Sequence, residues 1–188
     1  MNFADKITSI RIVLIPVFVA LLIYSQVNFY LRHIATAVFI IAVLSDFFDG
    51  LVARIKKEKS DIGQVIDPLA DKLLLFTAFF SLYILRGYLP LKFQIPLWVV
   101  LVVVSRDLII LLGFLTLQFL KIEVKVQPSI WGKLTTFFQM GAILCILMDV
   151  FFSPVIWTIA VVFTLISGIG YFLQGVKFIN GNIKPSNN

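Results

Sequence analysis

Long apolar stretches, separated by short polar breaks, run through almost the whole chain. Of its 188 residues 60% are hydrophobic, whereas an average soluble domain has about 45–50% apolar residues. A helix needs about 20 mostly apolar residues to cross the hydrocarbon core of a bilayer, and several stretches reach that length. The pattern predicts an all-α, polytopic membrane protein.

The polar breaks divide the chain into six predicted transmembrane helices that form a single domain. The expected helices are Ile7–Ser25, Leu31–Arg54, Pro68–Leu85, Phe93–Leu117, Ser129–Val150 and Pro154–Ile179. Prolines mark several of the breaks, because proline is favoured in the first turn of a helix. We expect residues 1–179 to form the membrane domain and residues 180–188 to form a polar tail.

Most basic residues lie on one side of the predicted membrane. Six helices place both termini on that side, with Lys6, Arg11, Arg54, Lys56, Lys57, Lys59, Lys121, Lys125, Lys133, Lys177 and Lys184; the other side has Arg32, Arg86 and Lys92. Loops rich in Lys and Arg stay in the cytoplasm. Both termini and the 54–66 loop are therefore predicted to be cytoplasmic in a protein of the cell membrane. The net charge is +6, but the lysines and arginines form no basic stripe and no aromatic platform lies among them. This distribution argues against nucleic-acid binding.

Four aspartates interrupt the apolar pattern around the break between the second and third predicted helices. Asp46, Asp49 and Gly50 share one face of a helix by their spacing. Asp67 and Asp71, four residues apart, share one face of the next helix. Because a short loop joins the two helices, the four carboxylates are predicted to meet at the inner membrane surface.

Four carboxylates cannot all stay ionised in a low-dielectric cleft without compensation. An all-oxygen ligand set, without His or Cys, suits Mg²⁺, Mn²⁺ or Ca²⁺ rather than zinc. The small residues Gly50, Ala53 and Gly63 leave room for a bulky substrate, and the Arg54 guanidinium suits a phosphate group. Metal and phosphate at a membrane boundary indicate phosphoryl-group chemistry on a lipid.

Simpler roles for single aspartates account for less of the pattern. Asp67 before Pro68 is a good helix N-cap, and Asp46 alone could be an interfacial residue. Such roles leave open why Asp46 and Asp71 also fall on the matching faces. A cation transporter would need polar groups through the depth of the bilayer, whereas these acids gather near one surface.

Written with its gaps, the segment from Asp46 to Asp71 reads D-x2-D-G-x2-A-R-x8-G-x3-D-x3-D. It resembles the signature of the CDP-alcohol phosphatidyltransferases in all eight fixed positions. NFADKITSIRIVLIP, at the start, resembles the first helix of that family. PSIWGKLTTFFQM resembles the fifth-helix segment of bacterial phosphatidylglycerophosphate synthases, so the resemblance extends from Asn2 to about Gln139.

The resemblance implies a six-helix membrane enzyme, usually a homodimer, that transfers a phosphatidyl group from CDP-diacylglycerol to an alcohol and releases CMP. It implies that Asp46, Asp49 and Asp67 hold divalent cations, Mg²⁺ or Mn²⁺, with two ions in each site. Asp71 also faces this centre and is the implied general base. The positions implied to bind the cytidine diphosphate part of the donor are Asp49, Gly50, Ala53, Arg54 and Gly63.

The acceptor alcohol is predicted from basic residues near the cytoplasmic side. A cluster of Arg106, Lys133 and Arg11 would favour a phosphorylated acceptor such as glycerol 3-phosphate. Asp107 could instead simply neutralise Arg106, and the other two could set the topology. The fourth helix reads SRDLIILLGFL without a second arginine, and there it resembles the CMP-forming cardiolipin synthases, whose acceptor is phosphatidylglycerol. The fifth-helix resemblance places glycerol 3-phosphate first.

Overall fold

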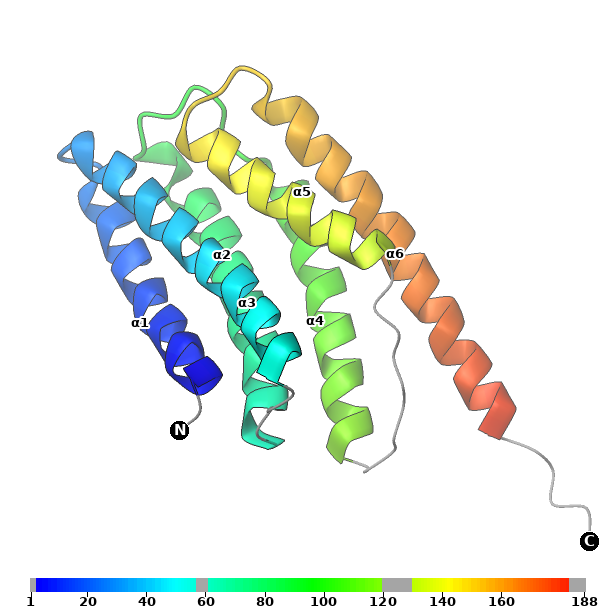
Figure 1. Ribbon diagram of the computed structural model, residues 1–188. Coiled ribbons are helices and arrows are strands. Elements are labelled where there is room, and N and C mark those ends of the chain that lie inside the picture. Colours follow the sequence, from blue (N-terminus) through cyan, green and yellow to red (C-terminus); the bar gives the residue numbers. More distant parts are fainter. Residues whose placement is uncertain (1–2, 57–60, 120–129, 183–188) are drawn as a thin grey trace, which may run out of the picture.

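The computed structural model describes residues 3–56, 61–119 and 130–182 (Figure 1). Within these ranges the chain forms six α-helices, one 3-10 turn and no strand, which confirms the all-α class. In chain order the elements are α1 Phe3–Tyr24, α2 Tyr30–Lys56, α3 Asp61–Ile84, η1 Leu85–Gly87, α4 Leu97–Phe119, α5 Ile130–Leu147 and α6 Ser153–Asn182. The last helix extends three residues into the predicted polar tail, 180–188.

The helices alternate in direction, so the bundle has two distinct ends (Figure 1). The loop end contains the connections from α1 to α2, from α3 to α4 and from α5 to α6. At the opposite end, which we call the site end, α2 finishes at Lys56 and α3 begins at Asp61. The start of α1 and the finish of α6 also lie at the site end (Figure 1).

The packing joins three groups of helices. α1 packs against α2 and α3, α5 packs against α6, and α4 packs against α3 and α6. The core between them is aliphatic and aromatic, with Phe18, Phe39, Phe79 and Ile143 fully buried. This arrangement places α3 beside α4, and α4 beside α6, so polar residues of these three helices can meet.

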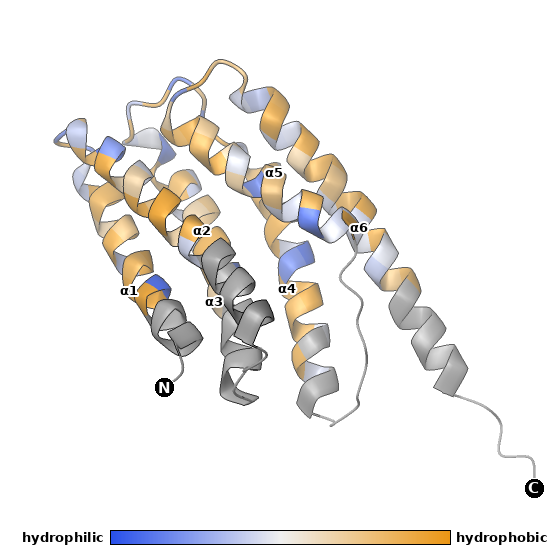
Figure 2. Cartoon of the chain, in the orientation of Figure 1, coloured by the Kyte–Doolittle hydropathy of each residue, from blue (hydrophilic) through white to orange (hydrophobic). Residues whose placement is uncertain are grey.

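Two helical segments in the described ranges are long and apolar enough to cross a membrane: Ile130–Leu147 and Ser153–Leu173. Only 33% and 28% of these residues are buried, whereas the core helix of a soluble protein would be mostly buried. Large apolar side chains also face outward on other helices, including Val13 at 63% exposure and Ile109 at 69%. Figure 2 shows that apolar residues make up most of the coloured length of the helices. A surface of this kind suits lipid rather than water, so the chain is a membrane protein.

The third helix does not begin at Pro68 as predicted. α3 begins at Asp61, so Gly63 is helical and the bounds of the predicted 54–66 loop are wrong. The prediction depended on the preference of proline for the first turn of a helix. Proline is tolerated inside membrane helices, where neighbouring groups satisfy the freed carbonyl, and α1 likewise contains Pro16.

Two other predicted helix ends also shift for local reasons. α4 begins at Leu97, four residues after the predicted Phe93, because Pro96 disfavours helical geometry in the residue before it. α5 ends at Leu147, three residues before the predicted end. There Asp149 has a φ of 59°, a left-handed backbone conformation that cannot continue the helix.

Candidate active site

The acidic positions of α2 continue the face that this helix packs into the bundle. Ala35, Phe39 and Ala42 follow one another at helical spacing, and each is 0% exposed. The same spacing leads to positions 46, 49, 50 and 53 near the site end. The side chains of residues 46–56, 61–69 and 71 lie outside the part of the chain that the structure describes, although the places of these residues within α2 and α3 are described.

The acidic positions of α3 continue a packed face in the same way. Gly63, Asp67 and Asp71 are each four residues apart within the helix, so an N-cap role for Asp67 is wrong. Leu74 and Ala78, further along this face, are 1% and 0% exposed. The acidic positions of both helices therefore lie in line with buried positions, on adjoining ends of α2 and α3.

The donor chemistry at these positions fits a divalent cation. Carboxylate oxygens are the ligands that Mg²⁺ and Mn²⁺ prefer, and a charged group at membrane depth needs a counter-charge. Among the described side chains there is no group of three His, Cys, Asp or Glu residues that suits a metal ion. The four predicted ligands, Asp46, Asp49, Asp67 and Asp71, lie outside those described side chains, so their metal binding stays a prediction.

Arg106, the first predicted acceptor residue, lies in α4 and is held from two sides. Its Nη1 donates to Asp107 Oδ1 at 2.5 Å, and its Nη2 donates to Ser167 Oγ on α6. Its guanidinium carbon lies 5.6 Å from the centre of the Tyr171 ring. The side chain is 9% exposed, and Nε has no hydrogen-bond partner among the described residues. The ion pair with Asp107, the alternative to an acceptor role for Arg106 in the sequence analysis, is thus present.

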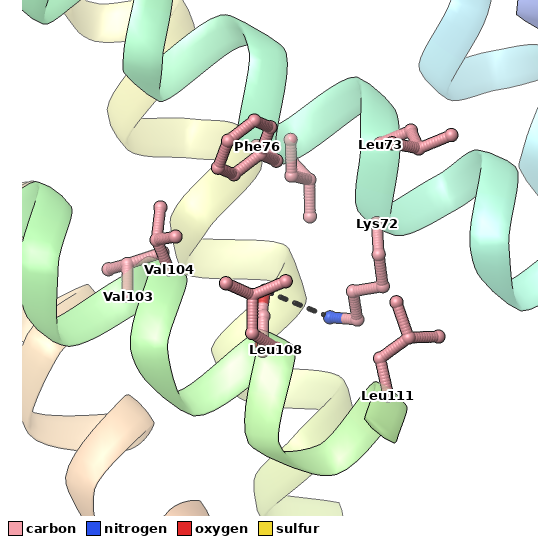
Figure 3. A pocket seen from close by; sticks show the side chains of 9 residues that line it. Lys72, Leu73, Phe76, Val103, Val104, Leu108 and Leu111 are labelled. Carbon is pink, nitrogen blue, oxygen red and sulfur yellow. Dashed lines mark hydrogen bonds and ion pairs between the residues drawn. The ribbon is translucent and has the colours of Figure 1, made fainter. Parts of the chain in front are cut away.

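Asp107 binds a second cation, Lys72 of α3. The Lys72 Nζ donates to Asp107 Oδ2 at 3.1 Å, reaching from α3 to α4 (Figure 3). Lys72, Arg106 and Asp107 thus carry a formal surplus of one positive charge. They lie about midway along α3 and α4, and we call them the site-end cluster because Lys72 directly follows Asp71 of the acidic segment. Sequence reasoning missed Lys72 and Ser167, although Lys72 directly follows Asp71 in the chain.

The other two predicted acceptor residues differ in exposure. Lys133 is exposed in the first turn of α5. A Cβ built on its neighbour Gly132 would lie 3.1 Å from the Tyr171 hydroxyl, so the start of α5 reaches the part of α6 that contacts Arg106. Arg11 lies within α1 and is only 1% exposed. A basic residue that determines the membrane orientation usually lies in a loop instead.

A groove of about 150 Å³ separates α3 from α4 next to the site-end cluster (Figure 3). Apart from Lys72 and Asp107 its lining is apolar: Leu73, Leu75, Phe76, Val103, Val104, Leu108 and Leu111. Apolar walls lower the effective dielectric and strengthen electrostatic interactions nearby. The cluster is therefore partly shielded from water while Lys72 remains 19% exposed.

The fold and these polar residues define a helical membrane protein with a charged cluster about midway along α3, α4 and α6. The family model described as CDP-alcohol phosphatidyltransferase matches residues 1–166, and the chain belongs to this family. A protein of Mycobacterium tuberculosis named "Probable phosphatidylglycerophosphate synthase" is 32% identical over 96% of this chain and 84% of its own. A Bacillus subtilis protein named "CDP-diacylglycerol--glycerol-3-phosphate 3-phosphatidyltransferase" is 31% identical over 91% and 93%. An Aquifex aeolicus protein of the same name is 29% identical over 95% and 98%.

Membership of the family establishes the class of reaction. The chain is a phosphatidyltransferase enzyme of phospholipid synthesis, as the resemblance of the Asp46–Asp71 segment predicted.

Proposed function

We propose that this protein transfers the phosphatidyl group of CDP-diacylglycerol to glycerol 3-phosphate, giving phosphatidylglycerol phosphate and CMP. The observation that carries the proposal is the register of the acidic segment. Positions 46 and 49 on α2, and 67 and 71 on α3, continue the faces that these helices pack into the bundle. The names of the Bacillus subtilis and Aquifex aeolicus relatives support glycerol 3-phosphate as the acceptor.

The donor site is assigned to the same two helices. Two Mg²⁺ or Mn²⁺ ions would be held in each site by Asp46, Asp49, Asp67 and Asp71. A bound cation would withdraw charge from the pyrophosphate oxygens and so make CMP a better leaving group. Gly50, Ala53 and Gly63 leave space for the cytidine diphosphate part, Asp49 also borders it, and the Arg54 guanidinium binds its phosphate oxygens.

The transfer step needs a base, because an alcohol is a poor nucleophile until its proton is removed. The Asp71 carboxylate takes the proton of the acceptor hydroxyl as that oxygen attacks the β-phosphorus, the one that bears diacylglycerol. The bond between this phosphorus and the CMP oxygen breaks, and CMP leaves with the bonding electrons. The displacement is direct and forms no covalent enzyme intermediate.

Arg106 is assigned to the phosphate of the acceptor. Its position is fixed by Asp107 and Ser167, and its buried Nε has a donor that no described residue uses. A fixed guanidinium binds phosphate with less loss of side-chain freedom than a flexible one does. Lys133 and Arg11 are the further candidates, one exposed at the start of α5 and one buried in α1.

A second candidate acceptor is phosphatidylglycerol, which would make the enzyme a CMP-forming cardiolipin synthase. The apolar groove between α3 and α4 favours it, because a lipid acceptor needs a place for its acyl chains. The absence of a second arginine from the SRDLIILLGFL segment points the same way.

The proposed setting is the cytoplasmic membrane, with six transmembrane helices, both termini in the cytoplasm and the site open to that side. The excess of Lys and Arg on this side supports the orientation. A homodimer is the assembly that the family resemblance implies.

The test is release of CMP by purified protein in nanodiscs that contain CDP-diacylglycerol and Mg²⁺ or Mn²⁺. Glycerol 3-phosphate and phosphatidylglycerol are supplied separately, and thin-layer chromatography identifies the product. We expect phosphatidylglycerol phosphate with the first acceptor and no turnover when EDTA removes the metal. Cardiolipin as the only product would replace the first acceptor with the second, and CMP release unaffected by EDTA would refute the role of the aspartates as metal ligands.

A further inference from the structure

We propose that Lys72 and Arg106, held together by Asp107, form a two-cation site for the phosphate group of the acceptor, with Lys72 as its second anchor. The proposal rests on the phosphatidyl transfer proposed above and names a residue to which no pattern in the sequence assigned a role. The phosphate belongs either to a free phosphomonoester such as glycerol 3-phosphate or to a lipid headgroup.

The charge balance is the first argument. Asp107 is 11% exposed, and one cation is enough to neutralise its carboxylate; Arg106, at 2.5 Å, already does so. The Lys72 Nζ lies 3.1 Å from the other carboxylate oxygen, Asp107 Oδ2, and the Lys72 side chain is only 19% exposed. A largely desolvated ammonium without its own counter-ion is costly, so the surplus charge favours binding of an anion.

The unused hydrogen-bond donors are the second argument. The Lys72 ammonium has three N–H groups, and its only interaction in the described structure is with Asp107. The Arg106 guanidinium uses Nη1 and Nη2 for Asp107 and Ser167, which leaves the buried Nε–H without a partner among the described residues. Two neighbouring cations with free donors are the groups that bind phosphate oxygens most strongly.

The place of Lys72 in the chain is the third argument. It directly follows Asp71, the proposed base, so their Cα atoms are about 3.8 Å apart, the fixed distance across a trans peptide bond. Consecutive helical residues do not face each other, so a phosphate held by Lys72 would lie beside the acidic face of α3, within reach of the turn that contains Asp71. The apolar walls of the adjoining groove, including Leu108 and Phe76, exclude water and strengthen this attraction.

The experiment measures binding of glycerol 3-phosphate by titration calorimetry, with the protein in phosphatidylcholine nanodiscs. CMP and Mg²⁺ are present, because CMP and glycerol 3-phosphate cannot react with each other. We expect Lys72→Gln to weaken binding about tenfold or more, the usual loss for one charge-assisted hydrogen bond. Lys72→Arg should restore most of the affinity, since it restores the charge.

The matched control is Lys92→Gln, which removes one lysine charge at the loop end, where the side chain is exposed. Equal affinities of Lys72→Gln and Lys92→Gln would overturn the proposal, and so would a wild-type protein that binds no glycerol 3-phosphate and no phosphatidylglycerol. In steady-state assays Lys72→Gln should raise KM for the acceptor and leave KM for CDP-diacylglycerol unchanged. Equal rises in both would indicate a structural role and overturn the proposal.

A second series of nanodiscs, containing phosphatidylglycerol, distinguishes the two sources of phosphate. If this lipid competes with glycerol 3-phosphate in the wild type and not in Lys72→Gln, the site accepts a lipid phosphate and the two-cation assignment stands. If binding depends on Lys72 while the wild type releases no CMP with either acceptor, the two-cation site is upheld and the proposed function is the part that fails.

Discussion

The bundle has two charged clusters, one at the loop end and one about midway along α3 and α4, and they are built differently. At the loop end Arg32 faces one carboxylate, Asp149, at 3.8 Å, and donates to the Pro90 carbonyl at 3.2 Å. Asp149 also accepts a hydrogen bond from the Lys92 backbone N–H at 2.8 Å. In the site-end cluster two cations, Lys72 and Arg106, share the single carboxylate of Asp107.

The difference separates a structural cluster from a binding cluster. The Arg32 and Asp149 charges cancel, and both residues also contact backbone groups that fix the loops between helices. The Arg32 guanidinium carbon lies 4.3 Å from the centre of the Phe29 ring. The Arg32 Nε is also buried without a partner among the described residues, so an unused donor alone does not distinguish the two ends. The surplus charge distinguishes the two clusters, because an anion would compensate the extra positive charge of the site-end cluster, whereas the Arg32–Asp149 pair is already neutral.

The largest expected effect comes from the proposed base. Asp71→Asn should lower turnover by about 10²–10⁴-fold, the contribution typical of a positioned general base. CDP-diacylglycerol binding and thermal unfolding should change little, because the amide has the same shape. The measurement is CMP release over time, together with a melting curve of the same sample.

The loop-end counterpart is Asp149→Asn, and it should affect stability instead of turnover. Asparagine tolerates the φ of 59° at this position, and its amide oxygen still accepts the Lys92 N–H. Loss of the pairing leaves the buried Arg32 without its counter-charge and should cost about 1–3 kcal/mol of unfolding free energy. Turnover of Asp71→Asn close to that of Asp149→Asn would show that Asp71 is not the base.

A smaller effect is expected when each cluster loses its arginine. Arg106→Gln should raise KM for the acceptor about 10- to 100-fold, as expected for a lost charged hydrogen bond, because the acceptor phosphate loses this donor. Its effect on stability should be modest, because Lys72 still neutralises Asp107. Arg32→Gln leaves Asp149 without its cation and should cost about 1–3 kcal/mol of stability with an unchanged KM.

Steady-state kinetics and thermal unfolding of both variants check this contrast. If Arg106→Gln has normal kinetics and a strongly lowered unfolding temperature, Arg106 stabilises the fold as Arg32 does. In that case the surplus charge of the site-end cluster would have no role in acceptor binding.

The helices were predictable because apolar stretches of membrane length are a strong signal. The third helix shows the limit of that signal, since its predicted start is Pro68 although α3 begins at Asp61. A proline indicates the start of a helix in water, where the chain beyond it can turn away. A proline inside a helix is tolerated where neighbouring groups satisfy the freed carbonyl, and α3 continues through Pro68.

The site was predictable only where its residues are close in sequence. Spacing alone placed Asp67 and Asp71 on one helix face, and the helical register of α3 agrees with it. Lys72 and Arg106 come from different helices and meet through Asp107. Helix periodicity contains no information on which residues of α3 and α4 lie at the same depth, so this contact needed the tertiary structure.

The smallest expected effects come from two glycines of α5 that meet different neighbours. A Cβ at Gly141 would lie 3.9 Å from Ile156 Cγ2, which is ordinary contact, whereas at Gly132 it would lie 3.1 Å from the Tyr171 hydroxyl. Gly141→Ala should therefore stabilise the protein by about 0.5–1 kcal/mol, the usual preference for alanine within a helix. Gly132→Ala should lose that gain, because the Tyr171 ring must move.

The same movement connects this pair of variants to the site-end cluster, since the Tyr171 ring lies beside the Arg106 guanidinium. Gly132→Ala should therefore cause a small rise in KM for the acceptor, and Gly141→Ala should cause none. Thermal unfolding and acceptor titrations of the two variants check both expectations. Equal stabilisation by the two alanines, with identical KM values, would show that Tyr171 yields freely and does not help to hold Arg106 in place.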